Sequence, residues 1–484
     1  MTNGRLRTML GYGLGECANS LVMNGFFAFA MLYYTEALHL DPSLAGIAMS
    51  VSVFWEAITD PVMGHVSDHT RHRLGRRHPW MLVGGLLMAV CFYFIWAVPP
   101  SIRADAHRVF WYLIAVNLLL RTGLTMFFIP YVALGFEIGS DYEGRSKVQA
   151  VRQVFNMLAN FGGPAMAWSI FFRDATAPDG TKILGTSQPA NFAHMGAAFS
   201  FAIVVMVLAV LWLTRGWVED SRHAPCESNA GGLRSFWLDL KAILLDPNPR
   251  WVFVFIFILC VGMVLVSSLQ MYVYVYFMKF QPHEKSIAHG STMIGMALGG
   301  AVSALASKQF DKKGAVMLGG ILSIFCNAAL GALFLTGAVA VGGFSALALF
   351  VVFHASYWLG NGILLPVSTA MVADVSAIHL ARTGTKKDGS YAAVFSLCMR
   401  LAISFALMAS GWTLSAVGFG AHAAAAAPSA RTVWNLGAAM FIGGLMVSIA
   451  ALLAIRKYPL TRASLDFLPV HRGPAPGIQA ANDD

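Results

Sequence analysis

Long apolar runs recur along the whole of this chain, and they constrain its fold more than any other feature. Runs of about 18 residues or more are each long enough to cross the ~30 Å hydrocarbon core of a bilayer as a helix. Only 12% of the 484 residues are charged, whereas a soluble domain carries about 25%. The sequence therefore predicts an all-α polytopic membrane protein.

About twelve spans can be placed from runs of this length. They are expected near residues 9–36, 43–67, 80–99, 109–138, 148–172, 193–215, 251–279, 287–307, 315–337, 343–373, 389–418 and 433–455. A long polar interruption divides them six and six, and its segment 235–244 (SFWLDLKAIL) is typical of an amphipathic helix on the membrane surface. The expected domains are an N-terminal half (1–215), a cytoplasmic middle loop (216–250), a C-terminal half (251–456) and a cytoplasmic tail (457–484).

The basic residues set the expected orientation. They concentrate in connections on one side of the membrane, among them Arg71, Arg73, Arg76, Arg77, Lys308, Lys312, Lys313, Arg382, Lys386 and Lys387. The side richer in Lys and Arg faces the cytoplasm, so both termini are expected inside, in a cytoplasmic (inner) membrane. Because the net charge of +9 is spread over these loops, nucleic acid is not an expected partner.

The two halves resemble each other weakly. A short basic hinge follows the second span (HRLGRR) and the eighth (KQFDKKG), and a proline precedes an acidic residue in both the fourth span (IPYVALGFE) and the tenth (LPVSTAMVAD). Six plus six spans with parallel internal similarity is the pattern of major-facilitator carriers. The second-span hinge predicts inter-helix charge pairs that hold the outward-facing state. This cytoplasmic gate would comprise Gly64, Asp68, Arg71, Arg76, Arg77, Glu137 and Asp374.

Two carboxylates inside the second span are the most informative residues. Glu56 and Asp60 would together cost on the order of 5–7 kcal/mol in a bilayer unless they are paired, protonated or cation-bound. Their i, i+4 spacing places them on one helix face, with Thr59 beside them. This face could bind Na⁺, share a proton, or form a salt bridge to a neighbouring span. The candidate partners are Arg121, which could instead snorkel outward, Arg152 and Arg400.

Other polar residues within spans indicate a water-filled cavity. The first span carries Glu16, Asn19, Ser20 and Asn24 at helical spacing, which favours a cavity over lipid. In the seventh span Gln270 is expected to reach this cavity, whereas Tyr274 and Tyr276 are expected in an interfacial aromatic belt. His354, Trp358 and Asn361 in the tenth span are weaker candidates, with His354 expected as a packed residue rather than a proton relay.

Enzyme motifs are missing from the sequence. HExxH, GxSxG and GxxxxGK[ST] do not occur, and the six cysteines lie far apart without metal-ligand spacing. Glycine runs such as GMALGG fit close helix packing. We therefore expect neither an enzyme nor a metal site, and no cofactor other than a coupling ion, H⁺ or Na⁺.

Several longer motifs carry a family resemblance that covers nearly the whole chain. DPVMG followed by DHTRHRLGRRHPW resembles the glycoside–pentoside–hexuronide:cation symporters, the melibiose-permease branch of the major facilitators. YGLGE, LYYTEAL, IPYVALGFEIGSDYEGRSKVQAVRQVF, MVADVSA and TGTKKDG match as well. The resemblance implies that Glu56, Thr59 and Asp60 bind the coupling ion. It also implies that Arg400 lies close to that site and that Arg152 helps to shape the sugar cavity.

The chain departs from melibiose permease at the sugar site. The two aspartates that hold the galactosyl hydroxyls correspond to Ser20 and Phe128, and a phenylalanine can neither accept a hydroxyl proton nor ligate a cation. Glu16, four residues before Ser20, could take over part of this role, and Ala377 replaces a usual aspartate near the gate. The expected cavity residues are Glu16, Asn19, Ser20, Asn24, Phe128, Arg152, Gln270, Trp358 and Arg400.

These observations predict a secondary active transporter, a monomer that moves a sugar, glycoside or similar small polar solute with H⁺ or Na⁺ by alternating access. Two alternatives stay open. The same fold could carry a lysolipid or other amphiphile, which Phe128 favours, or the chain could be a membrane sensor that binds without transport.

Overall fold

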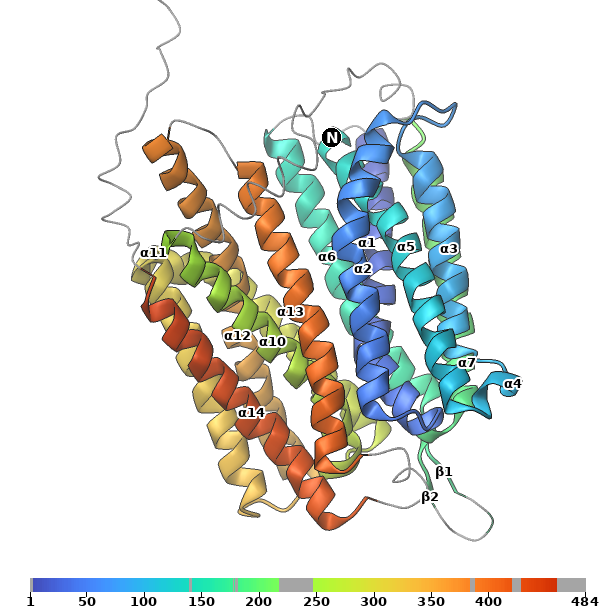
Figure 1. The fold of residues 1–484 in the computed structure, drawn as a ribbon, viewed down its shortest axis with the longest axis vertical. Helices are drawn as coiled ribbons and strands as arrows, with labels where there is room; N and C mark the ends of the chain where they lie inside the picture. Colours follow the sequence, from blue (N-terminus) through green and yellow to red (C-terminus); the bar gives the residue numbers. More distant parts are fainter. Residues whose placement is uncertain are drawn as a thin grey trace, which may run out of the picture.

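The computed structural model describes residues 3–138, 142–176, 178, 182–216, 247–383, 388–419 and 428–458. It is a bundle of long helices in two groups that lie side by side (Figure 1). The N-terminal group holds α1 (Asn3–Leu32), α2 (Pro42–His69), α3 (His78–Trp96), α5 (Ala106–Ile138), α6 (Tyr142–Met166) and α7 (Pro189–Leu213). The C-terminal group holds α10 (Pro247–Tyr272), α11 (Pro282–Leu335), α12 (Phe344–Thr383), α13 (Asp388–Val417) and α14 (Ala430–Arg456).

Short elements join these helices. The π-helical segments η1 (Tyr33–Ala37), η2 (Ala167–Phe171) and η4 (Val273–Phe277) extend α1, α6 and α10. A small hairpin of β1 (Ala175–Thr176) and β2 (Lys182–Ile183), the turn η3 (Gly185–Ser187) and α4 (Pro100–Arg103) lie at one end of the bundle, which we call the hairpin end. The opposite end carries the connection between α2 and α3 and is called the basic end (Figure 1).

The helices confirm the prediction of about twelve spans. Nine helices in the described residues are long and apolar enough to cross a membrane. One of them, α11, has 54 residues and a break at Asp311 (φ 62°, ψ 165°). At about 80 Å it is long enough to cross the membrane twice. α1 and α6 fall outside the nine because polar residues interrupt them. Counting α11 twice and adding these two gives the predicted number.

Most predicted boundaries lie within a few residues of the helix ends. The tenth span is the main exception, because α12 continues to Thr383 instead of ending near residue 373. The predicted amphipathic helix at 235–244 lies outside the described residues, as do most of the middle loop and of the tail. α1 begins and α14 ends at the basic end (Figure 1).

A repeated backbone relates the two groups. η1 begins at Tyr33, is followed by His39 with a positive φ of 55°, and leads to Pro42 at the start of α2. The same succession recurs 240 residues later, with η4 beginning at Val273, Lys279 at φ 55° and Pro282 starting α11. A non-glycine residue with positive φ is uncommon. Its recurrence at matching positions therefore shows that the groups are structural repeats, as the major-facilitator prediction requires.

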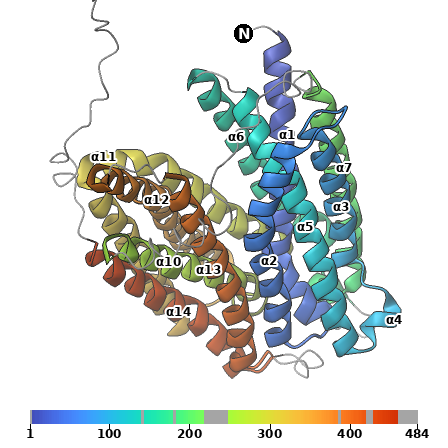
Figure 2. The same ribbon diagram turned by 45° about the horizontal axis from the view of Figure 1, so that its top comes forward.

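The two groups meet at the hairpin end. The Tyr276 hydroxyl of η4 donates to the carboxylate of Glu36 in η1, and the Thr35 and Tyr272 hydroxyls lie 2.6 Å apart. Figure 2 shows the groups separating toward the basic end, where α1 begins. The described conformation is therefore closed at the hairpin end.

The expectation of an aromatic belt at Tyr274 and Tyr276 is wrong. Tyr274 is fully buried, and Tyr276 bonds to Glu36 of the other group. Interfacial and buried aromatic residues look alike in a sequence, since both lie near the end of an apolar run. Here the end of the seventh span packs against the first span instead of facing lipid.

Glycines bring α11 and α12 into backbone contact. A Cβ atom added at Gly299 would lie 2.1 Å from the carbonyl oxygen of Leu359, and one added at Gly295 would lie 2.1 Å from that of Ala355. Small residues at helix crossings allow this close approach in membranes.

We expect Gly299→Ala to destabilise the protein by about 1–3 kcal/mol, because the added methyl group forces the two helices apart. Thermal unfolding in detergent would measure the change. Gly443→Ala in α14 is the matched control, since nothing lies within 4 Å of its Cβ position and alanine favours a helix by up to ~1 kcal/mol over glycine. Equal unfolding temperatures for the two variants would contradict this account of the contact.

Candidate functional site

Close packing of α2 on α13 positions the central charged residues. A Cβ atom added at Gly411 of α13 would lie 2.2 Å from the carbonyl oxygen of Pro42, so the two backbones are in contact there. The hydroxyls of Ser50 and Ser404 lie 2.8 Å apart further along the same interface. The helices run antiparallel, and the next turns therefore bring Arg400 of α13 opposite Glu56 and Asp60 of α2.

Five residues form a charged cluster at this place. The fully buried Glu56 accepts a hydrogen bond from Nη1 of Arg121 in α5 at 3.0 Å and a second one from Nη1 of Arg400. Asp60 accepts from Nη2 of Arg400 at 2.9 Å and from the hydroxyl of Thr125 at 2.7 Å. We call Glu56, Asp60, Arg121, Arg400 and Thr125 the Glu56 cluster. Its two carboxylates face two guanidinium groups, and Arg400 links the two halves.

The side chain of Arg121 does not snorkel. It is only 1% exposed, and its guanidinium carbon lies 4.5 Å from the ring centroid of Phe26 and 5.3 Å from that of Phe27. The sequence left pairing and snorkelling open, and the structure shows pairing with Glu56.

Thr59 reaches the cluster only through Thr125. Its hydroxyl donates to the carbonyl oxygen of Trp55 at 3.2 Å and lies 3.4 Å from that of Thr125. The indole of Trp55 donates to Thr122 of α5 at 2.9 Å. The role of Thr59 as an ion ligand stays a prediction.

Three polar pairs join α1 to α6 in register. They are Glu16 with Arg152, Ser20 with Asn156, and Asn24 with Asn160, each 136 residues apart. On each of the two helices the paired residues are four positions apart, so they lie on one face of the helix. The pairs run in the same direction along both helices, which are therefore parallel. The Asn156 amide donates to Ser20 at 2.7 Å and to Glu16 at 3.1 Å, and Asn19 also donates to Glu16, at 3.5 Å. We call these pairs the polar ladder.

Phe128 is a neighbour of the ladder. The guanidinium of Arg152 lies 5.4 Å from the Phe128 ring centroid and 5.9 Å from that of Tyr131, within the range of cation–π attraction. Arg152 thus has one ionic partner, Glu16, and two aromatic partners, and its side chain is 22% exposed. Of the ladder residues, Asn156 and Asn160 were not predicted, although their i, i+4 spacing from Arg152 is a signal that could have found them.

The candidates in the C-terminal group are buried in this conformation. The ring of His354 lies 3.0 Å from the Gln270 amide oxygen, and the indole nitrogen of Trp358 lies 3.3 Å from the same ring nitrogen of His354. All three side chains are buried, so His354 is packed as expected. Gln270 and Trp358 are closed off from solvent in this conformation.

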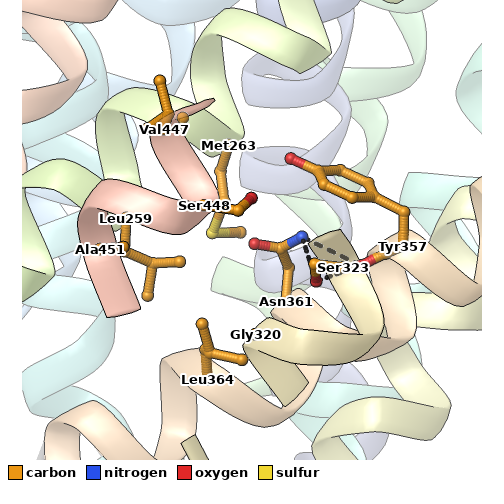
Figure 3. A pocket seen from close by; sticks show the side chains of 11 residues that line it. Leu259, Met263, Gly320, Ser323, Tyr357, Asn361, Leu364, Val447, Ser448 and Ala451 are labelled. Atoms are coloured by element: carbon orange, nitrogen blue, oxygen red, sulfur yellow. Dashed lines mark hydrogen bonds between the residues drawn. The ribbon is translucent and has the colours of Figure 1, made fainter. Parts of the chain in front are cut away.

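A small cavity lies inside the C-terminal group (Figure 3). Asn361 donates to Ser323 at 3.3 Å and to the carbonyl oxygen of Tyr357 at 2.9 Å beside it. The cavity has room for about one water molecule, whereas small-molecule sites measure about 300–1,000 Å³. It is therefore too small for a sugar.

Ion pairs stabilise both basic hinges. Arg77 pairs with Asp68 at 2.5 Å and donates to Ser67 at 2.9 Å. In the C-terminal group Lys312, next to the break in α11, lies 2.6 Å from both carboxylate oxygens of Asp374 in α12. Asp374 therefore takes part in an inter-helix pair, but each ion pair lies within one half and neither joins the two halves. The role of these residues as a gate that holds the outward-facing state stays a prediction.

The other gate residues vary in their surroundings. Arg71 is exposed and Arg76 half-buried. A Cβ atom added at Gly64 would meet only Ile129, at 3.8 Å. The side chain of Glu137 lies outside the described residues. In the part of the chain that the structure describes, no group of three or more His, Cys, Asp or Glu side chains could hold a metal ion.

Comparisons with known proteins agree on membrane transport. A family model described as MFS/sugar transport protein matches residues 11–462. Inner membrane symporter YicJ of Escherichia coli is 28% identical over 235 residues, which cover 48% of this chain and 47% of that protein. Sodium-dependent lysophosphatidylcholine symporter 1 of Mus musculus is 30% identical over 164 residues, 33% of this chain and 30% of that protein. The chain thus spans less than half the length of these curated relatives.

A solved structure confirms the fold. A bacterial homologue of the human lysosomal transporter Spinster, in an inward-facing and unoccupied conformation, matches with a TM-score of 0.66 at 13% identity. The match covers 95% of this chain and 98% of that one. At this identity the likeness establishes the major-facilitator fold alone.

Proposed function

The chain belongs to the MFS/sugar transport protein family, and on that basis we propose that it is a cation-coupled symporter of the glycoside–pentoside–hexuronide branch. It moves a sugar, glycoside or similar small polar solute together with H⁺ or Na⁺ by alternating access. The basic end lies in the cytoplasm with both termini, and the chain acts as a monomer in the inner membrane.

The observation that carries this proposal is the Glu56 cluster. Arg400 of the C-terminal group bonds to Glu56 and Asp60 of the N-terminal group. A cation that neutralises one of these carboxylates weakens a bond between the two halves, and ligand binding can shift a conformational equilibrium only through such differential contacts. Cation binding would thereby be coupled to the rocking of the halves.

The polar ladder supports a hydroxylated substrate. Arg152 and Asn156 are part-exposed donors on α6, and Glu16 is an acceptor on α1 beside them. Sugar hydroxyls both donate and accept, so this mixture of groups suits them. Substrate would bind between the two halves, near the bilayer midplane.

A lysolipid or other amphiphile is the second candidate. Phe128 supports it, because an apolar ring stands beside Arg152 where the sugar carrier has an acceptor, and one relative is named a lysophosphatidylcholine symporter. A sensor would bind the same ligands without flux.

Uptake into proteoliposomes tests the proposal. A panel of sugars, glycosides and lysolipids would be offered while Na⁺ and pH gradients are imposed separately. We expect one sugar-class solute to accumulate only when a cation gradient is present. Accumulation of lysolipid alone would favour the second candidate, and binding without flux would favour a sensor.

A further inference from the structure

Arg121 carries a permanent positive charge into the Glu56 cluster. A guanidinium cannot lose its proton in a protein, and this one lies 3.0 Å from Glu56. Its Nη1 also lies 3.3 Å from the sulfur of Met23, and the rings of Phe26 and Phe27 enclose it. The side chain therefore has no route to water in this conformation, and its charge stays beside Glu56.

The carboxylate oxygens of the cluster all have hydrogen-bond donors. One oxygen of Glu56 faces Arg121 and the other faces Arg400. One oxygen of Asp60 faces Thr125 and the other faces Arg400. A sodium ion binds through several oxygens at once, and here it would have to share oxygens that already accept hydrogen bonds from guanidinium or hydroxyl groups. A proton needs only one oxygen.

The charge balance opposes any added cation, and a proton differs from Na⁺ in how it is held. The two carboxylates and the two guanidinium groups sum to zero, so a bound Na⁺ and a proton on Asp60 each leave a net charge of +1. The proton is held by a covalent bond to one carboxylate oxygen, whereas Na⁺ depends on several oxygens that already accept from guanidinium or hydroxyl groups. A unit charge about 4 Å from the Arg121 guanidinium would be repelled by about 4 kcal/mol at an effective dielectric constant of 20. Without Arg121 the cluster would carry −1, a charge that a monovalent cation neutralises.

Of the two carboxylates, Asp60 is better placed to accept a proton. Glu56 is fully buried, and each of its carboxylate oxygens faces a guanidinium group. Asp60 is 18% exposed and contacts one guanidinium, that of Arg400 from α13. The other groups facing it are Thr125 from α5 and Glu56 on its own helix. Protonation of Asp60 would remove the charge that pairs with Arg400 and weaken this bond between the halves, while Glu56 stays paired with Arg121.

We propose that Arg121 occupies the place of a coupling metal cation at Glu56, so that the cluster takes up a proton at Asp60 and excludes Na⁺. This inference rests on the proposed function, since it specifies the coupling ion of the same site. The repeat has no second pair of carboxylates, because the positions 240 residues after Glu56 and Asp60 are Met296 and Gly300.

The test is a gain of sodium binding in Arg121→Gln. Purified wild-type protein should show no thermal stabilisation by Na⁺ up to high millimolar concentration, with choline as the reference salt. Arg121→Gln should be stabilised by Na⁺, with an affinity at least tenfold above that of the wild type. In proteoliposomes, uptake by the wild type should follow a pH gradient only, whereas the variant should also respond to a Na⁺ gradient.

Two control variants separate this effect from a general loss of charge. Arg121→Lys keeps the positive charge and should stay insensitive to Na⁺. Arg108→Gln removes an exposed arginine that pairs with Asp105 near the start of the same helix, and it too should stay insensitive. Should Arg121→Gln not fold, Arg121→Met keeps the contact with Phe26 and Phe27 and serves the same test.

Sodium binding by the wild type would overturn the inference, as would a folded Arg121→Gln that gains none. These outcomes differ from a failure of the proposed function. If no gradient drives uptake of any solute, coupled symport is wrong, yet the Na⁺ titrations of wild type and variant still decide what Arg121 does.

Discussion

Asp60→Asn should abolish accumulation of substrate against a gradient and leave exchange of substrate across the membrane intact. Asparagine keeps the size of the side chain and an acceptor for Thr125, but it takes up no proton and no longer carries the charge that pairs with Arg400. Moving one charge through 100 mV supplies about 2.3 kcal/mol, which corresponds to about 50-fold accumulation at 1.4 kcal/mol per factor of ten. The variant should therefore fall from this order of accumulation to a ratio of about 1, as measured by uptake and counterflow in proteoliposomes.

Glu56→Gln should have a different effect from Asp60→Asn. It leaves Arg121 and Arg400 without their shared carboxylate, so loss of stability should accompany loss of uptake. Asp105→Asn is the control, since Asp105 pairs with the exposed Arg108 and its loss should change neither property. Normal accumulation in Asp60→Asn would contradict the assignment of coupling to this cluster.

The fold followed from hydropathy because each span of a bilayer needs its own apolar run. That rule places helices well but says little about what their ends touch. It could not distinguish Tyr276 at an interface from Tyr276 bonded to Glu36 of the other half. Nor could it show that α1 and α6 face each other, since pairing between helices depends on their register.

The site could be predicted at positions where placing the side chain in the bilayer has a high free-energy cost. Glu56 and Asp60 stand out because a carboxylate within a span must be compensated, whereas Asn156 and Asn160 are neutral and carry a weaker signal. The signal in the sequence was weaker for the partners of Glu56 and Asp60. The resemblance indicated Arg400, but whether Arg121 points inward or outward depends on the pocket of Phe26 and Phe27, which only the packed structure shows.

Arg152→Ala should destabilise the protein by about 3–5 kcal/mol, because it leaves the carboxylate of Glu16 buried without its ionic partner. Glu16 is only 5% exposed and keeps the Asn156 amide at 3.1 Å, so we expect a value near the lower end. Unfolding in detergent, followed by temperature or denaturant, would measure it.

The double variant Glu16→Ala/Arg152→Ala decides between an ion pair and mere packing. If the unpaired charge is the cause, removing Glu16 as well should recover part of the loss, with a coupling energy of about 0.5–3 kcal/mol between the two sites. If the two losses simply add, the Glu16–Arg152 pair contributes nothing beyond contact area. The attachment of α1 to α6 would then depend on the other two pairs of the ladder and on packing.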